Sequence, residues 1–179
     1  MKEENKYFSR KGFTLIEIVL YVALSAIIGL VLVTFFIQAI KITETSRSSR
    51  ESLDNARHSI NLIEQEIRQA TSVYNLTSVF GTNPGQLSLE TTRDLPADED
   101  TTYVDFYVDA GGLYIKREGQ STMLITSQKV KVTNLVFTLL NTTAEGSAVK
   151  TDLTIEYSDP IFGSKTPVRL STTTSLRSY

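Results

Sequence analysis

A long apolar run near the N-terminus limits what this chain can fold into. The run extends from Phe13 to Ile40 and contains one charged residue, Glu17. A bilayer core is crossed by about 20 apolar residues, and a single spanning segment must be an α-helix because backbone groups in lipid have to pair within it. We therefore predict a membrane-spanning helix. The basic residues before the run modestly favour a cytoplasmic N-terminus.

The helix is expected to continue beyond the apolar run. Between the start of the run and Asn83 the chain has no proline, and its only glycines are Gly29 and Gly81. Apolar residues then recur at alternating steps of three and four, a spacing that places them on one helical stripe. The stripe comprises Leu53, Ala56, Ile60, Ile63, Ile67, Ala70 and Tyr74. We predict a single helix from about Thr14 to about Ser72.

The second part of this helix is amphipathic. Its remaining surface carries three pairs of opposite charge at i,i+4 spacing, which are Arg47/Glu51, Arg50/Asp54 and Glu64/Arg68. We predict that the apolar stripe packs on a sheet of the same chain. A two-stranded coiled coil is the alternative.

The second half of the chain has the pattern of a mostly antiparallel sheet. A turn cluster at 81–85 follows the helix, and Asp109–Gly112 has the composition of a hairpin turn. Segments rich in β-branched and aromatic residues alternate with such turns. About six strands are expected, at 86–91, 103–108, 113–117, 130–140, 149–157 and 168–176, and 123–127 is a further candidate. The predicted fold class is α+β, a long helix packed on this sheet.

The composition excludes several kinds of site. The chain has no cysteine, which excludes disulfides, thiolate ligation and a thiol nucleophile. Its one histidine, His58, is predicted to lie at the surface. No phosphate-binding loop or nucleophile–base pair stands out, so neither an enzyme nor a cofactor is predicted. The net charge of −2 argues weakly against nucleic acid, although a local basic patch could form from Lys129, Lys131, Arg169 and Arg177.

Two further groups of residues have both a functional and a structural interpretation. The acidic stretch Asp94–Asp100, with Asp105, could supply oxygen ligands to calcium, but it lacks EF-hand spacing and a solvated loop is preferred. Four aromatic residues could stack on a base or sugar, but core or cross-strand packing is preferred. They are Tyr103, Phe106, Tyr107 and Tyr114.

Glu17 needs an explanation. An acidic residue at the centre of a spanning helix costs about 2.5–3.5 kcal/mol, and Glu17 lies nearer one end, where the cost is smaller. A secretory signal peptide has a shorter apolar region, about 7–15 residues, with a small-residue cleavage site after it. No clear site of that kind follows this run. A plain signal anchor fits the length but gives no reason for the glutamate.

Residues 10–17, RKGFTLIE, resemble the prepilin signature of type IV pilins and type II secretion pseudopilins. The resemblance implies that an aspartyl prepilin peptidase cuts between Gly12 and Phe13 on the cytoplasmic side and methylates the new amine of Phe13. It also implies that Glu17, fifth in the mature chain, pairs with the amine of an adjacent subunit during assembly. Most type IV pilins have a proline within the apolar segment, and this chain has none there.

The resemblance implies a structural pilin or pseudopilin subunit of a type II secretion or type IV pilus system. Its expected partners are prepilin peptidase, other pilin or pseudopilin subunits, the inner-membrane assembly platform and membrane lipid. The expected location is the bacterial cytoplasmic membrane, in a single pass with the globular domain outside the cytoplasm, and then the filament. The alternatives are a single-span membrane-anchored binding domain, or a subunit of a DNA-uptake or adhesive pilus.

The same resemblance divides the chain into four segments. These are a leader peptide at 1–12, the transmembrane and polymerisation half of the helix at 13–40, its amphipathic half at 41–80, and a β-rich globular domain at 81–179. Looser similarities, in the late helix at 55–70 and at 108–114, 129–135 and 172–177, point to the J-class minor pseudopilins and W-class minor pilins. A minor subunit would cap or prime a filament, and a major subunit would form its shaft.

Overall fold

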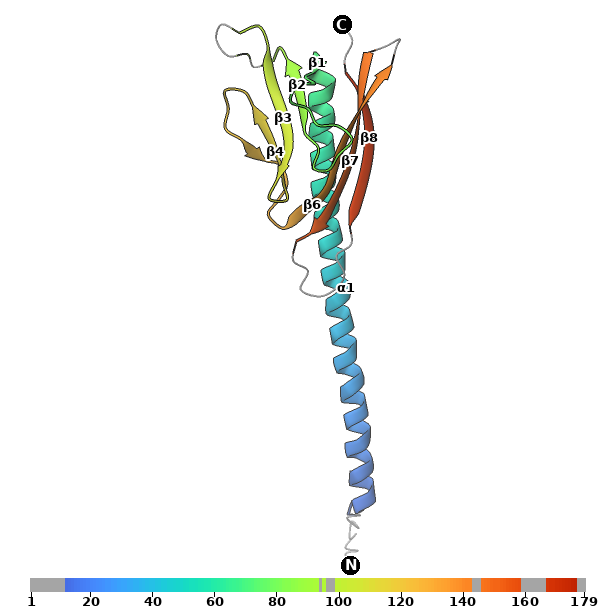
Figure 1. Ribbon diagram of the computed structural model, residues 1–179. Helices are drawn as coiled ribbons and strands as arrows, with labels where there is room; N and C mark the ends of the chain where they lie inside the picture. The colour runs from blue at the N-terminus through green and yellow to red at the C-terminus, as the bar shows by residue number, and fades with distance from the viewer. Residues whose placement is uncertain (1–11, 94, 96–98, 143–145, 159–166, 177–179) are drawn as a thin grey trace, which may run out of the picture. The chain divides into compact units, whose positions relative to one another are not determined.

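The computed structural model describes residues 12–93, 95, 99–142, 146–158 and 167–176. It divides the chain into two compact units, 1–42 and 43–179. Helix α1 (Leu15–Gln69) contributes residues to both units, and the strands that follow pair antiparallel (Figure 1). The predicted α+β class, with one long N-terminal helix and antiparallel sheets, is therefore confirmed.

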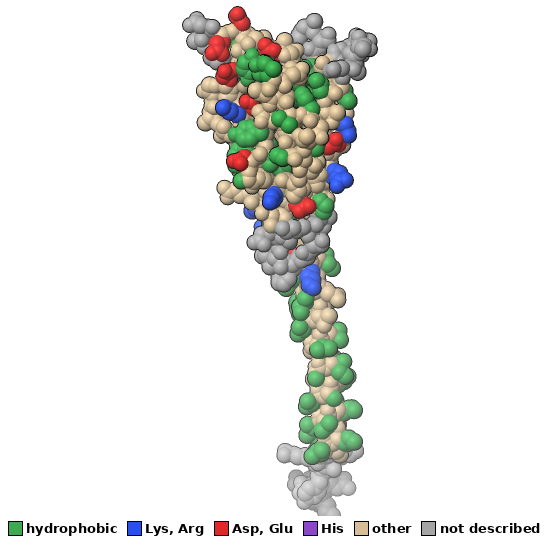
Figure 2. Space-filling model, viewed as in Figure 1, with side chains coloured by type: hydrophobic (Ala, Val, Ile, Leu, Met, Phe, Trp, Pro, Cys, Tyr) green, Lys and Arg blue, Asp and Glu red, His purple; other side chains and the backbone are tan. Residues whose placement is uncertain are grey.

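In the N-terminal unit, helix α1 carries apolar side chains on every side. None of the described residues up to Ile42 is buried, and Leu15 and Leu30 are 82% and 72% exposed. Figure 2 shows green hydrophobic side chains along the visible face of this part of the helix. The helix continues through Gly29 and is long and apolar enough to span a membrane. A helix that is apolar all round is stable when lipid or other protein surrounds it, not water.

In the C-terminal unit, the predicted stripe is buried from Ala56 to Ala70, whereas Leu53 is partly buried and Tyr74 lies beyond the end of α1. Ala56, Ile63 and Ile67 are fully buried, and Ile60 and Ala70 nearly so, in one core cluster with residues of the strands. The prediction that the stripe packs on the chain's own sheet is confirmed. Three serines of the helix are also buried, Ser48, Ser52 and Ser59. Apolar periodicity could not have found them, because serine is not counted as apolar.

The strands form two sheets, seen to either side of the C-terminal part of α1 in Figure 1. The first has the order β1-β2-β3-β4-β5, and the second β6-β7-β8. Their bounds are β1 Ser72–Val73, β2 Leu87–Thr91, β3 Thr102–Asp109, β4 Gly112–Arg117, β5 Met123–Leu124, β6 Val130–Thr142, β7 Gly146–Tyr157 and β8 Val168–Ser175. Six predicted strands are found with small shifts of their ends, the candidate at 123–127 is limited to β5, and β1 was not predicted.

The helix ends earlier than the sequence indicates. It was expected to reach about Ser72, and the amphipathic helical segment was drawn to residue 80, but α1 ends at Gln69. The amide of Ala70 still bonds to the Ile67 carbonyl, at 3.3 Å, whereas the Thr71 amide donates to the Glu90 carbonyl at 2.8 Å. Pairing with strand β2 thus replaces the next helical hydrogen bonds. Residues 70–80 hold β1 and a loop instead of helix.

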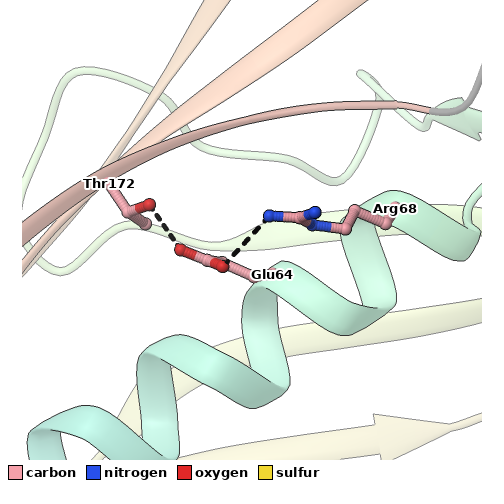
Figure 3. Close-up of polar contacts among 3 residues, drawn as sticks. All are labelled: Glu64, Arg68 and Thr172. Carbon is pink, nitrogen blue, oxygen red and sulfur yellow. Dashed lines mark hydrogen bonds and ion pairs between the residues drawn. The ribbon is translucent and has the colours of Figure 1, made fainter.

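Two glutamates of α1 connect the helix to different sheets. Glu64 accepts a hydrogen bond from the Thr172 hydroxyl on β8 and lies 3.4 Å from Arg68 (Figure 3). Glu66 forms an ion pair with Arg117 on β4. Of the three predicted helical pairs, Glu64/Arg68 is the one present among the described residues. Arg47/Glu51 and Arg50/Asp54 do not form ion pairs there, and Glu51 instead accepts a hydrogen bond from the Ser127 hydroxyl at 3.1 Å.

One predicted turn joins two strands of the first sheet, and the other bonds to an edge strand of the second sheet. At 109–112, β3 pairs with β4 through a tight hairpin whose central residues, Ala110 and Gly111, both have positive φ. Two central residues with positive φ define the turn that matches the twist of paired strands. The 81–85 turn lies along β6, where the Gly81 amide donates to the Phe137 carbonyl at 2.9 Å and the Leu135 amide to Asn83 Oδ1 at 2.9 Å. The turn thereby satisfies backbone groups of an edge strand.

Removing side-chain volume from the stripe should destabilise the C-terminal unit. We expect Ile63→Ala to lower the free energy of unfolding by about 2–5 kcal/mol, because the residue is fully buried and leaves a cavity. Leu76→Ala removes the same number of carbons from a side chain that is 84% exposed. This substitution should change the free energy of unfolding by less than about 0.5 kcal/mol. Denaturant unfolding of the full chain in detergent micelles measures both. Equal losses would contradict the role assigned to the stripe.

Asp152 makes a pH-dependent contribution to the second sheet. A hydrogen bond from Ser171, and then one from Lys150 at 2.9 Å, lower the pKa of the Asp152 carboxyl below its ordinary 3.8. A group whose pKa is lowered by folding adds stability above its unfolded pKa and loses it as the pH falls through the folded value. We expect the stability difference between the native chain and Asp152→Asn to disappear as the pH falls below about 3.8. Unfolding curves between pH 2 and pH 6 test this, and a difference independent of pH would contradict it.

Candidate processing and assembly site

Helix α1 begins with a side-chain cap. Thr14 precedes the first helical residue, and its carbonyl accepts from the amides of Glu17 and Ile18 at 3.1 and 3.3 Å. The Thr14 hydroxyl oxygen also accepts from the Glu17 amide, at 3.4 Å. A threonine followed three residues later by glutamate is the sequence pattern of a capping box. Thr14 therefore fixes where the helix starts and places Glu17 in its first turn.

Glu17 is half-buried although its neighbours are exposed. The Tyr21 hydroxyl, one turn further along, donates a long hydrogen bond to Glu17 Oε1 at 3.4 Å. A carboxylate in the first turn also interacts favourably with the helix dipole, which contributes about 0.3–1 kcal/mol at an exposed site. Glu17 therefore has one long side-chain hydrogen bond within the described residues, and most of the hydrogen-bonding capacity of its carboxyl group stays available.

The bond between Gly12 and Phe13 lies just before the cap, outside regular secondary structure. Both residues are exposed, and the Phe13 side chain is 72% accessible. A Cβ atom added to Gly12 would have no heavy atom of the described residues within 4 Å, and Gly12 is not among the described glycines with positive φ. The folded chain therefore places no steric or conformational demand for glycine at position 12.

The structure brings the predicted residues together at one end of α1. Gly12, Phe13 and Glu17 span the transition from irregular chain to the first helical turn, and Gly12 and Phe13 are exposed. Cutting after Gly12 would leave a free amine on Phe13, next to the helix cap. An amine and a carboxylate at the same helix end can form a charge-assisted hydrogen bond, within one chain or between two.

Sequence reasoning missed two residues of this site. Thr14 caps the helix, and its signal was the Thr-x-x-Glu spacing with Glu17. Tyr21 contacts Glu17, and its signal was the i,i+4 separation that makes two helical side chains neighbours. Thr14 was interpreted only as part of the motif at 10–17 and as the approximate start of the helix, and Tyr21 as an ordinary member of the apolar run.

The described residues of the other candidate sites do not form a metal site or a basic patch. Most of the acidic stretch, at 94 and 96–98, lies outside the described residues, and within the described ones no group of three potential metal-ligating side chains occurs. His58 is exposed, as predicted. Lys129, Lys131 and Arg169 are exposed, but Lys131 lies opposite Glu156 in the strand register. Arg177 lies outside the described residues.

Comparison of the chain with protein-family models, with curated proteins and with solved structures finds no match.

Proposed function

We propose that this chain is a structural subunit of the type IV pilin-like class, cut between Gly12 and Phe13 and assembled through helix α1. One observation carries the proposal. An exposed glycyl bond is followed, within one helical turn, by Glu17, the one acidic residue of an otherwise exposed apolar segment at 13–40. In an isolated chain the glycine is unnecessary and the glutamate is costly. Cleavage after Gly12 and assembly through Glu17 explain why both residues are present.

Gly12 supports the cleavage step. Since neither packing nor backbone conformation requires glycine there, the requirement lies outside the folded chain. A narrow peptidase site that admits no side chain at this position would supply it. The proposed enzyme is a prepilin peptidase, which also methylates the amine of Phe13.

Glu17 supports the assembly step. Its only described side-chain partner, Tyr21, is 3.4 Å away and leaves the carboxylate largely unsatisfied. In lipid this group is costly, and the new amine of Phe13 in an adjacent subunit would compensate its charge. Docking into a filament is then favoured over free diffusion in the membrane, and the exposed apolar side chains pack between helices.

The remaining parts of the proposal follow from this class. The chain would be a single-pass protein of the bacterial cytoplasmic membrane with its C-terminal unit outside the cytoplasm, and it would then enter a secretion or pilus filament. Other pilin or pseudopilin subunits, the inner-membrane assembly platform and lipid would be its partners. It would be no enzyme and would bind no nucleic acid. The looser resemblance favours a minor subunit.

The cap at Thr14 favours a second candidate, a membrane-anchored binding domain. Glu17 stabilises its own helix start through the dipole, and its amide bonds to Thr14. A glutamate at this position therefore has a local benefit even if α1 serves only as an anchor. Variants of Gly12 and Glu17 distinguish a filament subunit from a membrane-anchored binding domain.

Substitution at Gly12 tests the cut. In a host that contains a prepilin peptidase, we expect mass spectrometry to find a mature chain that begins with methylated Phe13. Gly12→Ala should be cut slowly, and Gly12→Leu should stay uncut because its side chain does not enter the peptidase site. Since the fold leaves space at this position, neither variant should change the stability of the C-terminal unit. A native chain that retains its first twelve residues while it functions overturns the proposal.

Substitution at Glu17 tests assembly. We expect Glu17→Leu to insert into the membrane normally and to be absent from filaments, because the Phe13 amine of the neighbour loses its partner. Thr14→Ala is the matched control, since it removes the capping hydroxyl, costs about 0.5–2 kcal/mol of helix stability and keeps the carboxylate. It should still assemble. Normal incorporation of Glu17→Leu into filaments would reject the proposed role of Glu17 in assembly.

A further inference from the structure

The outer face of the five-stranded sheet carries aromatic and charged side chains. On β3, Val104 and Phe106 are buried, so the alternating Tyr103, Asp105 and Tyr107 lie on the opposite face. The strand register places Tyr114 and Lys116 of β4 directly beside Tyr107 and Asp105 on that face. This is a face of the domain that its own core does not use.

The tyrosines of this face form two different pairs. Tyr107 and Tyr114 stack across the strands with ring centroids 5.8 Å apart and planes 17° apart. Tyr74 and Tyr103 meet at 4.9 Å with planes inclined at 55°. The inclined pair forms one side of a cavity of about 350 Å³, which is also lined by Thr77, Asp105, Lys116, Glu118 and Gly119.

The charges of this cavity are not neutralised in pairs. Asp105 and Glu118 form no ion pair or side-chain hydrogen bond with any described residue. Lys116 lies opposite Asp105 in the register, but no ion pair joins them within the described chain. Two carboxylates and one ammonium give the cavity a net charge of −1, beside two aromatic rings.

We propose that this cavity binds an arginine side chain presented by a partner protein. A guanidinium is planar and can stack on a tyrosine ring. At the same time its five N–H donors can reach the two carboxylates, in the bidentate geometry that a carboxylate offers. The negative charge selects a cation, and the aromatic walls favour arginine over lysine, whose compact ammonium is more strongly hydrated.

Lys116 modulates this site. Its ammonium lines the same cavity and opposes the charge of an incoming guanidinium. Because Lys116 is exposed, its flexible side chain can leave the cavity when the ligand enters. Its removal should therefore strengthen binding, an effect that a merely structural role of the cavity would not produce.

The test uses the full chain in non-ionic detergent micelles and a capped glycine peptide with one central arginine as the probe. Selectively labelled tyrosines report binding by NMR. We expect Asp105→Asn and Glu118→Gln to weaken binding several-fold, Tyr103→Leu to weaken it about tenfold, and Lys116→Gln to strengthen it. A peptide with citrulline in place of arginine, which has a similar shape but no charge, should not bind.

Matched variants on the same face control for non-specific attraction. Asp109→Asn removes a charge from the end of β3, and Tyr107→Leu removes a tyrosine from the other pair, and both lie outside the cavity. Both should leave the affinity unchanged. Equal binding of the citrulline peptide, equal weakening by Asp109→Asn and Asp105→Asn, or no gain from Lys116→Gln would overturn the proposal. If Tyr103→Leu does not fold, the exposed Glu118→Gln and Lys116→Gln still decide it.

Discussion

The apolar stripe of α1 is buried by two separate sheets, and the C-terminal unit depends on this shared packing. β1–β5 and β6–β8 are not hydrogen-bonded into one sheet. A common core joins them, in which Ile63 and Ile67 lie with residues such as Phe106 and Phe137, and the Val132 amide of β6 donates to the Gly111 carbonyl in the β3–β4 turn at 2.8 Å. Burial of such side chains contributes about 1.5–3 kcal/mol each. The two glutamates next to the stripe also connect α1 to each sheet, since Glu64 bonds to β8 and Glu66 to β4.

This dependence explains which parts of the fold could be predicted. The stripe and the hairpin at 109–112 are local patterns, so spacing and turn composition were sufficient to find them. The end of α1 is not local, because the Thr71 amide bonds to Glu90, nineteen residues further along. No glycine or proline marks that position. For the same reason the two-residue strand β1 was missed. The i,i+4 pair Arg47/Glu51 within α1 was expected, whereas the Ser127 hydroxyl donates to Glu51 instead.

In the candidate site, too, local features could be predicted from the sequence and a non-local feature could not. Its residues could be predicted, because a glycine, an aromatic residue and a glutamate follow each other in a short motif at 12–17. The cap at Thr14 could have been predicted and was overlooked. What a single sequence does not contain is the other half of the proposed interaction. An amine created by cleavage, on an adjacent subunit, has no residue in this chain whose spacing could reveal it.

The described carboxylates of this protein differ in their partners. Glu64, Glu66 and Asp152 are satisfied by groups of the same unit, and such contacts stabilise the fold. Glu17 has one long hydrogen bond, and Asp105 and Glu118 have no described partner. An unsatisfied carboxylate beside apolar or aromatic surface has more to gain from a cation than one fully exposed to water. Both proposals rest on this difference, and each places an external cation, an amine or a guanidinium, beside a carboxylate that has no ion pair with any described residue.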